Sequence, residues 1–340
     1  MGWKEGPLKV CIYGTGAVGG YLAARIGHAE IAEVSVVARG AQKEAIVAAG
    51  IRLETPEGVM SFRPSRVTDD PFTLPPQDVT FVTLKVMQQP GAAQSLCHLS
   101  GQDGVAVFAA NGIPWWWKYG GQSPVSLPLV DPQGELWNRF GAHRAIGCVV
   151  YSANEVIAPG VIKHKGNNRW VLGEASGLPS DRLERIIQLM RAGGIAAEAS
   201  PNLRAEILAK LLRNAALNSL CALTRLPVDG LAEDPALLAI ADAIVEEIIS
   251  VSAAMGYDIV AHREAAWTQL RRGGAEGKAP AVKGLRPSML QDVLAGRPIE
   301  VEAILGQFKA LAEEYGAPCP AIDGVLPLVR GLDRSLRANM

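Results

Sequence analysis

Three glycines near the N-terminus have the spacing of a phosphate-binding turn. Gly14, Gly16 and Gly19 lie between a short apolar run and a helix-like pattern. The first glycine allows a tight turn, the second lets the backbone approach a pyrophosphate, and the third allows helix and strand to pack closely. A helix that begins at Ala17 and Val18 directs its unpaired N–H groups and its positive dipole end toward such phosphates. The motif predicts a dinucleotide site.

Arg39 stands where the second half of that site is expected. The run Val34 to Ala38 reads as the next strand, and in NAD-binding proteins an acidic residue at its end binds the ribose 2′-hydroxyl. This chain has Arg39 there and no Asp or Glu. A guanidinium binds a 2′-phosphate with bidentate geometry, although Arg39 could also be a solvated loop residue. The position favours NADP(H) as cofactor.

A helix in the second half of the chain carries a polar stripe. Lys210, Asn214 and Asn218 are spaced at i, i+4 and i+8 within the predicted helix Leu203 to Thr224, whose remaining circumference is almost entirely apolar. A buried lysine and two buried asparagines need polar partners, which substrate and cofactor could supply. Desolvation also suits a lysine to act as a general acid. The alternative is a structural pair between Lys210 and Glu206 or another carboxylate.

Four further polar positions are candidates. Ser288 could bind a substrate carboxylate and Glu300 a substrate hydroxyl, or they could be a helix N-cap and a first-turn acid. Lys85 and Asn111 follow predicted strands, at the sheet edge where ligands bind in such folds. Asn111 and Gly112 could equally form only a turn.

The order of the predicted elements gives the fold class. Strand and helix patterns alternate over residues 1–199, which predicts a mostly parallel sheet, and residues 200–340 have almost only helical periodicity. We therefore expect an α/β Rossmann nucleotide-binding domain followed by an all-α C-terminal domain. The predicted strands are Leu8–Tyr13, Val34–Ala38, two short strands around Pro56–Gly58, Asp78–Leu84, Val105–Ala110, Ile146–Tyr151, Val161–His164, Trp170–Leu172 and Ile195–Glu198. The predicted helices include Gln42–Ala49, Gln88–Leu99, Asp181–Arg191, Leu203–Thr224, Ala236–Met255, Ala261–Arg271, Met289–Ala295, Val301–Tyr315 and Ile322–Arg337.

Two segments do not follow these patterns. The Gly- and Lys-rich stretch 271–284 lacks a core pattern, and both a mobile lid and a tether are consistent with it. Trp115, Trp116 and Trp117 either line a pocket or pack against the sheet, and packing is favoured because three successive side chains cannot face one way.

Composition excludes several classes of protein. The 33 basic and 34 acidic residues leave no electrostatic footprint for nucleic acid or an anionic membrane. Five cysteines without a CxxC pair, and five histidines without HxxxH or HExxH spacing, argue against disulfides and a metal site. We find no secretory signal and no apolar run of the roughly 18–20 residues that span a bilayer. We expect a cytoplasmic protein.

The chain contains the segments GTGAVGG, Arg39, VTLK ending at Lys85, Asn111-Gly112, EVxxPGVIKHxG from Glu155 to Gly166, AKLLRNAALN and SMLQDVLAGRPIE. Taken together, these segments resemble the ketopantoate reductases (2-dehydropantoate 2-reductases) over almost the whole chain.

The resemblance implies a Rossmann domain, a helical domain and an active site in the cleft between them. It implies that Lys210 protonates the keto oxygen as NADPH delivers hydride, and that Glu300 binds the substrate hydroxyl. It further assigns substrate positioning to Asn214, Asn218 and Ser288, contact with cofactor and lysine to Asn111, and cofactor binding to Arg39 and Lys85.

Some positions depart from the family pattern. A long Trp-rich segment spans residues 113–140, Ile299 stands where Thr is common, and Ser219-Leu220-Cys221 replaces a Pro-containing form. The first prediction is reduction of ketopantoate. The alternatives are a related reductase for another 2-keto acid or an imine, and a non-catalytic NADP-binding sensor. The apolar C-terminal helices could also supply a homodimer surface.

Overall fold

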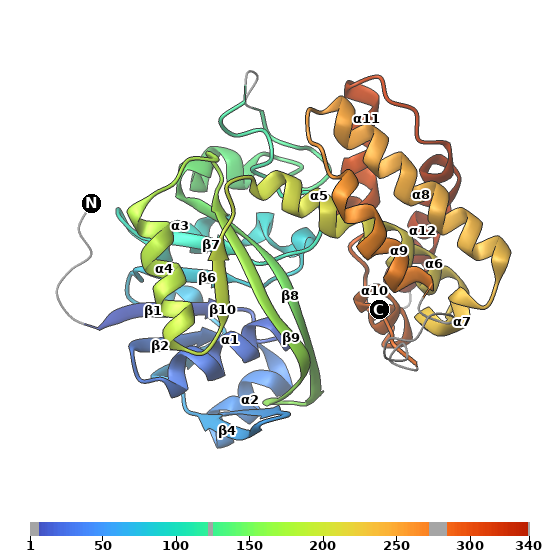
Figure 1. Ribbon diagram of the computed structural model, residues 1–340. Coiled ribbons are helices and arrows are strands. Elements are labelled where there is room, and N and C mark those ends of the chain that lie inside the picture. The colour runs from blue at the N-terminus through green and yellow to red at the C-terminus, as the bar shows by residue number, and fades with distance from the viewer. Residues whose placement is uncertain (1–6, 122–124, 272–283, 339–340) are drawn as a thin grey trace. The chain divides into compact units, whose positions relative to one another are not determined.

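The computed structural model describes residues 7–121, 125–271 and 284–338 (Figure 1). The chain splits into two compact units, one of Met1–Ala110 with Pro114–Leu203 and one of Asn111–Ile113 with Arg204–Met340. The sequence placed one boundary, after residue 199. The structure adds the short segment Asn111–Ile113 to the second unit.

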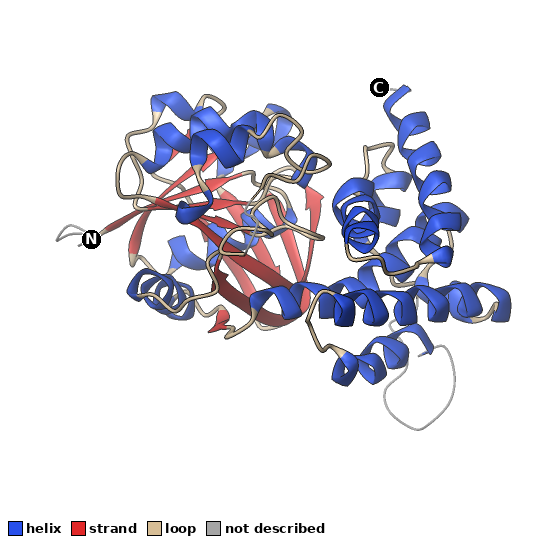
Figure 2. Ribbon diagram, turned by 90° about the horizontal axis from the view of Figure 1, so that it is seen from above, coloured by secondary structure: helices blue, strands red, loops and turns tan. Residues whose placement is uncertain are grey.

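The first unit is built on a mixed, mainly parallel sheet, and it holds all the strands in the described part of the chain (Figure 2). The strand order is β4-β3-β9-β8-β7-β6-β1-β2-β5, with β10 paired to β9, and only the β3–β4 and β8–β9 pairs are antiparallel. This agrees with the predicted Rossmann-type fold. The strands are β1 (Leu8–Tyr13), β2 (Ala32–Val37), β3 (Ile51–Thr55), β4 (Gly58–Phe62), β5 (Arg66–Thr68), β6 (Val79–Val82), β7 (Val105–Phe108), β8 (Ala145–Ala158), β9 (Val161–Glu174) and β10 (Ala196–Ala199).

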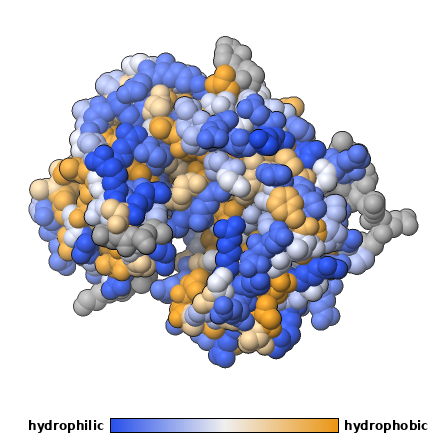
Figure 3. Space-filling model, turned by 180° about the vertical axis from the view of Figure 1, so that it is seen from behind, coloured by the Kyte–Doolittle hydropathy of each residue, from blue (hydrophilic) through white to orange (hydrophobic). Residues whose placement is uncertain are grey.

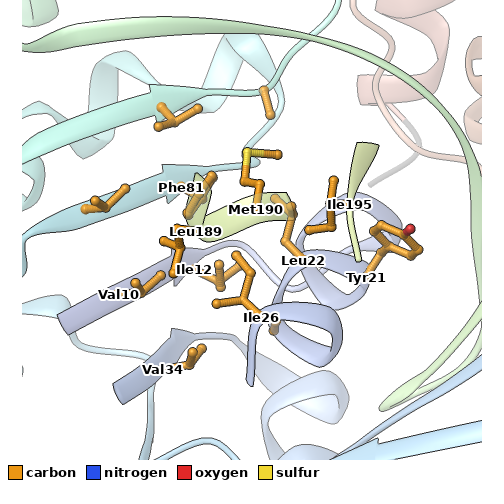
Figure 4. Close-up of a cluster of buried hydrophobic side chains, with 14 of the residues drawn as sticks. Val10, Ile12, Tyr21, Leu22, Ile26, Val34, Phe81, Leu189, Met190 and Ile195 are labelled. Carbon is orange, nitrogen blue, oxygen red and sulfur yellow. The ribbon is translucent and has the colours of Figure 1, made fainter. Parts of the chain in front are cut away.

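Helix α1 (Ala17–His28) sits in the bend of this sheet. It contacts β1 and β2 near one end of the strand order and β3 and β4 at the other, so the sheet curves around it. Figure 4 shows the buried apolar side chains that β1, β2, α1 and α4 (Asp181–Ala192) contribute to this core. Two further helices, α2 (Gly40–Ala49) and α3 (Ala93–Ser100), complete the main helices of the unit. The core therefore fixes the turn between β1 and α1.

Several predicted elements of this unit were wrong in extent, and the strand predicted over Ile146–Tyr151 is part of the longer β8 (Ala145–Ala158). The runs expected as separate strands, Val161–His164 and Trp170–Leu172, belong to one strand, β9. The residues between them, 165–169, are polar or glycine and alternate between exposed and half-buried, so no apolar pattern marks the strand there. The helix expected over Gln88–Leu99 begins only at Ala93, after short 3₁₀ turns. Pro90 explains the delay, since proline donates no hydrogen bond and disfavours helix in the preceding residue.

The second unit contains only helices and loops among its described residues. Its elements are α5 (Leu203–Arg213), η6 (Asn214–Asn218), α6 (Ser219–Thr224), α7 (Val228–Ala232), α8 (Pro235–Ala254), η7 (Val260–His262), α9 (Arg263–Arg271), α10 (Ser288–Leu294), η8 (Glu302–Gly306), α11 (Gln307–Glu314) and α12 (Pro320–Ala338). Two helices predicted as continuous are interrupted, because η6 and η8 are π turns with wider i→i+5 hydrogen bonding. Such turns are rare and are enriched at functional sites.

Most of the possible lid or tether at 271–284, namely residues 272–283, lies outside the described residues. No helix that the structure describes has both the length and the apolar character needed to cross a membrane. On the face shown in Figure 3, hydrophobic residues are interspersed with hydrophilic ones. Exposed apolar side chains that are scattered in this way are normal for a folded chain.

Candidate functional site

The predicted glycine turn joins β1 to α1. Gly14 has a φ of +98°, which favours glycine. A Cβ at Gly19 would collide with the carbonyl oxygen of Gly14 and with Thr83 Oγ1, which itself donates a hydrogen bond to that oxygen. A Cβ at Gly16, by contrast, would meet no described atom within 4 Å. Packing within the chain thus explains Gly14 and Gly19, whereas Gly16 leaves room for a group outside the chain.

The N-terminus of α1 offers hydrogen-bond donors. Gly16 is the N-cap of this helix and forms no side-chain cap, and the first turn, which starts with Ala17 and Val18, contains no acidic residue. The hydroxyl of Thr15 is buried and finds no partner in the described part of the chain. Unpaired N–H groups, a positive dipole end and a buried hydroxyl are suitable partners for phosphate oxygens. The turn fits the pyrophosphate of a dinucleotide.

A pocket of about 460 Å³ opens beside this turn. Its lining includes Gly14 and Gly16 from the turn and Arg39 from the end of β2, and it contains no acidic residue. Pockets of this size are typical of ligand sites. Lys85 follows β6 as expected but is not part of the lining, although the neighbouring Leu84 is. The full lining is Tyr13, Gly14, Thr15, Gly16, Val37, Ala38, Arg39, Gln42, Leu84, Gln88, Gly91, Ala92 and Val156.

Gln42 is a pocket residue that sequence reasoning missed. Its Nε2 donates to the carbonyl oxygen of Thr15 at 2.7 Å, and its Oε1 accepts from the N–H of Gly160 at 3.0 Å. One side chain thereby ties the glycine turn, helix α2 and the loop between β8 and β9 together. The signal in the sequence was a polar residue three positions after Arg39, in the first turn of a predicted helix.

An ion pair lies near Arg39. Lys43 Nζ is 2.7 Å from Asp69 Oδ1. The hydrogen bond from Lys43 holds the pKa of Asp69 below its ordinary value, and the charge of Arg39 adds a smaller effect in the same direction. Since Lys43 is already paired, Arg39 is the better candidate for an incoming phosphate.

In the second unit, Lys210 is held by an asparagine. Its Nζ donates to Asn111 Oδ1 at 2.8 Å, and Asn214 Nδ2 lies 3.5 Å from the same oxygen, at the limit of a hydrogen bond. The expectation that the whole stripe is buried was wrong. Lys210 and Asn214 are half-buried and only Asn218, at 2% exposure, is in the core. Leucines on the other sides of α5 fill the core, which leaves the polar stripe at its margin.

The π turn η6 affects how that stripe is aligned. Positions i, i+4 and i+8 of an α-helix drift by about 40° per step. A wider turn takes more residues per revolution and therefore reverses part of this drift. Because η6 covers Asn214 to Asn218, it brings Asn218 back toward the face of Lys210. Helical periodicity alone identified the residues but not this change of register.

Asn218 stabilises the start of α10. Its Oδ1 accepts hydrogen bonds from the N–H of Met289 at 3.2 Å and from Ser288 Oγ at 3.4 Å. The N-cap alternative for Ser288 was wrong, because Pro287 occupies the cap position and Ser288 is the first helical residue. Asn218 therefore substitutes for a local cap and sets the place of the exposed Ser288 side chain.

The segment Asn111–Ile113 rests on the π turn η8. The N–H of Ile113 donates to the carbonyl oxygen of Ala303 at 2.8 Å. Gly112 has a φ of +81°, and a Cβ there would collide with the same carbonyl group. Asn111 and Gly112 are thus more than a turn, because their contacts place the asparagine beside Lys210.

Elements that carry the predicted substrate residues converge within this unit. The π turn η6, which includes Asn214 and Asn218, contacts both η8 and α10. Glu300 lies two residues before η8 and is partly exposed, and Ser288 begins α10. The structure therefore groups the elements of the lysine stripe, the serine and the glutamate, whereas the glycine turn and Arg39 belong to the first unit.

The departures from the family pattern are mostly core residues. Trp115 and Trp116 are fully buried, and the ring of Trp115 packs edge-on against Phe108 and Phe140 with centroids 5.4 and 6.3 Å away. This confirms the packing interpretation of the tryptophans. Ile299 is 1% exposed and donates its N–H to Asp333, and Cys221 is a buried thiol whose pKa burial raises to about 12.

Comparison with known proteins agrees with this description. Residues 10–177 match the family pattern described as ketopantoate reductase PanE/ApbA, and residues 202–333 match that of its C-terminal part. A 2-dehydropantoate 2-reductase of Mesorhizobium japonicum is 36% identical over 330 residues, covering 96% of this chain and 98% of that protein.

Solved structures give the same result. A crystal structure from Ralstonia solanacearum MolK2, provisionally described as a ketopantoate reductase, superposes with a TM-score of 0.87 at 32% identity and covers 97% of this chain and 99% of that one. A ternary structure of D-mandelate dehydrogenase with NADH and anilino(oxo)acetate shares the fold, with a TM-score of 0.81 at 19% identity over 97% of this chain and all of that one. The chain belongs to the ketopantoate reductase family of oxidoreductases.

Proposed function

We propose that this protein reduces a 2-keto acid to the 2-hydroxy acid with NADPH, and that ketopantoate is the substrate and pantoate the product. The observation that carries the proposal is the 2.8 Å hydrogen bond from Lys210 Nζ to Asn111 Oδ1. It holds a partly exposed ammonium group in a fixed place next to η6 and within the unit that contains Ser288 and Glu300. An orientated ammonium group of this kind is suited to a developing alkoxide.

Lys210 is the general acid in this mechanism. Bound NADPH supplies the hydride, which is the chemistry that the chain itself lacks. The Lys210 ammonium donates a hydrogen bond to the keto oxygen and transfers a proton to it as negative charge develops there. Asn111 takes one of the three N–H donors of the ammonium group and so directs the lysine.

The remaining residues bind and orient. Glu300 accepts a hydrogen bond from the substrate hydroxyl, while Asn214 and Ser288 position the substrate. Asn218 acts on the substrate through Ser288, because its Oδ1 accepts a hydrogen bond from Ser288 Oγ at 3.4 Å. Its proposed role remains substrate positioning, exerted through the Ser288 side chain.

The first unit supplies the cofactor site. Gly14, Gly16 and the first turn of α1 hold the pyrophosphate, and Arg39 binds the 2′-phosphate. Support for NADP(H) over NAD(H) comes from the pocket lining, in which Arg39 is charged and no Asp or Glu is present. We keep Lys85 as a cofactor residue on the basis of its place in the loop after β6, next to the lining residue Leu84.

Packing of the tryptophans supports ketopantoate as the first choice of substrate. The Trp-rich segment was the main reason to consider another acid, yet Trp115 and Trp116 are fully buried and Trp116 packs on Gly147 of β8. Both indole rings therefore fill space in the core of the first unit. An aromatic acid specificity therefore has no support from these side chains.

A substrate panel tests the proposal. NADPH oxidation is followed with ketopantoate, with smaller and aromatic 2-keto acids, and with an imine. We expect the highest kcat/KM with ketopantoate. A preference for another acid or for the imine would establish the related-reductase alternative, and NADPH binding without oxidation by any compound would favour the sensor.

A further inference from the structure

The π turn η8 contains Gly306 and one partner of an ion pair, Glu302. Arg330 of α12 meets Glu302 of η8 in a bidentate pair, with Nε–Oε1 at 2.8 Å and Nη2–Oε2 at 2.7 Å. The pair is partly exposed, at 40% for the arginine and 34% for the glutamate. An isolated exposed pair contributes little to stability, and the bidentate geometry of this one orients the two side chains relative to each other.

Gly306 shows that this pair is built into the turn. Its φ is not in the left-handed region, and a glycine in a helix costs up to about 1 kcal/mol relative to alanine. A Cβ at Gly306 would collide with Glu302 Oε2 and would lie 3.0 Å from Arg330 Nη2. The glycine leaves room for the ion pair that lies over it, and a methyl group there would displace the ends of the Glu302 and Arg330 side chains.

The same turn seats the segment that holds the lysine. Ala303, the residue after Glu302, accepts the Ile113 N–H at 2.8 Å through its carbonyl oxygen. Gly112 lies directly against that carbonyl group, and Asn111 Oδ1 accepts from Lys210 Nζ at 2.8 Å. All these residues belong to the second unit.

We propose that Arg330 is a positioning residue for Lys210. Its pair with Glu302 fixes the π turn η8, the Ala303 carbonyl group of that turn fixes the segment Asn111–Ile113, and Asn111 directs the ammonium group. This inference rests on the proposed function, because it assigns a catalytic consequence to the orientation of Lys210. It requires no contact between Arg330 and substrate or cofactor.

Kinetics of Arg330→Met and Gly306→Ala test the proposal. The first variant removes the pair, and the second displaces it while keeping both charges. We expect kcat to fall about 10- to 100-fold in each, since a misplacement of about 1 Å in an active site costs up to 10²-fold. The Kd for NADPH should change less than about twofold, because the cofactor pocket lies in the first unit.

Lys309→Met is the matched control. Lys309 of α11 pairs with Asp323 of α12 at 2.6 Å, so it links α12 to the helix that follows η8 without touching the π turn. The Lys309→Met variant should lose about as much thermal stability as Arg330→Met but keep the wild-type kcat. If Arg330→Met and Gly306→Ala have the kcat of Lys309→Met, the positioning role is refuted.

The pH profile and a double variant separate this inference from the proposed function. Without a fixed Asn111, the Lys210 ammonium loses an acceptor that stabilises its charged form, so the alkaline limb of the kcat profile should move to lower pH. Arg330→Met should add little to the loss in Lys210→Ala, whereas full additivity would overturn the proposal. Near-normal turnover of Lys210→Ala would refute the proposed function and the positioning role together. An inactive Lys210→Ala with an unaffected Arg330→Met would refute the positioning role alone.

Discussion

Replacement of Arg39 by methionine should separate NADPH from NADH binding. The Arg39 side chain is exposed, provides no cap for α2 and forms no hydrogen bond or ion pair in the part of the chain that the structure describes. Its loss should therefore leave the thermal unfolding temperature nearly unchanged. A charge-assisted hydrogen bond contributes about 1.5–3 kcal/mol, which corresponds to roughly a 10- to 150-fold change in affinity. Since the site is open to solvent, we expect the lower half of that range for NADPH and no change for NADH.

Fluorescence titration with both cofactors gives the two dissociation constants. Lys43→Met serves as the control, because it removes one positive charge from the first turn of the same helix, where the ammonium group is already paired with Asp69 at 2.7 Å. A general loss of positive potential would affect both variants alike, whereas a direct phosphate contact affects Arg39→Met far more. Equal weakening of NADPH and NADH in Arg39→Met would refute the 2′-phosphate assignment.

Three further predictions concern the turn, a helix start and a buried histidine. Gly16→Ala should weaken NADPH binding without loss of stability, since its Cβ meets no described atom within 4 Å, whereas Gly19→Ala should also destabilise the fold by roughly 1–3 kcal/mol in chemical denaturation. Asn218→Ala should cost about 1–2 kcal/mol, because Met289 loses its acceptor, and an unchanged denaturation midpoint would contradict that role. Burial, with a smaller effect of a nearby arginine, lowers the pKa of His164 below its ordinary value of 6.5. The neutral imidazole therefore contributes stability that is present above pH 6.5 and is lost as the pH falls below it. His164→Gln should flatten this decline in the free energy of unfolding, and an identical pH dependence of unfolding in variant and wild type would exclude the effect.

Residues whose role depends on local chain geometry could be predicted from the sequence. The glycine turn follows from strand, turn and helix within a few positions, and Gly14 and Gly19 have the contacts expected of them. Lys210 and Asn214 were found through helical spacing, which survives because the α-helix continues to Arg213. The overall fold follows for the same reason, since alternating strand and helix patterns specify a parallel sheet.

Features that depend on tertiary contacts could not be predicted. The π turns η6 and η8 change the helical register, and single-sequence periodicity carries no signal for them. The role of Asn218 as a cap for α10 joins residues about 70 positions apart, and Gln42 joins the glycine turn to Gly160 in the same way. Partial exposure of Lys210 likewise depends on how α5 packs.

Turnover of Lys210→Ala tests whether Lys210 is the proton donor. NADPH oxidation with ketopantoate is measured for the wild-type protein and the variant, together with the NADPH dissociation constant of each. We predict that the wild-type protein turns over and that the variant loses activity by about 10²-fold or more with nearly unchanged NADPH affinity, since a positioned general acid contributes roughly 10²- to 10⁴-fold. Near-normal turnover of the variant would contradict the assignment of Lys210 as the proton donor.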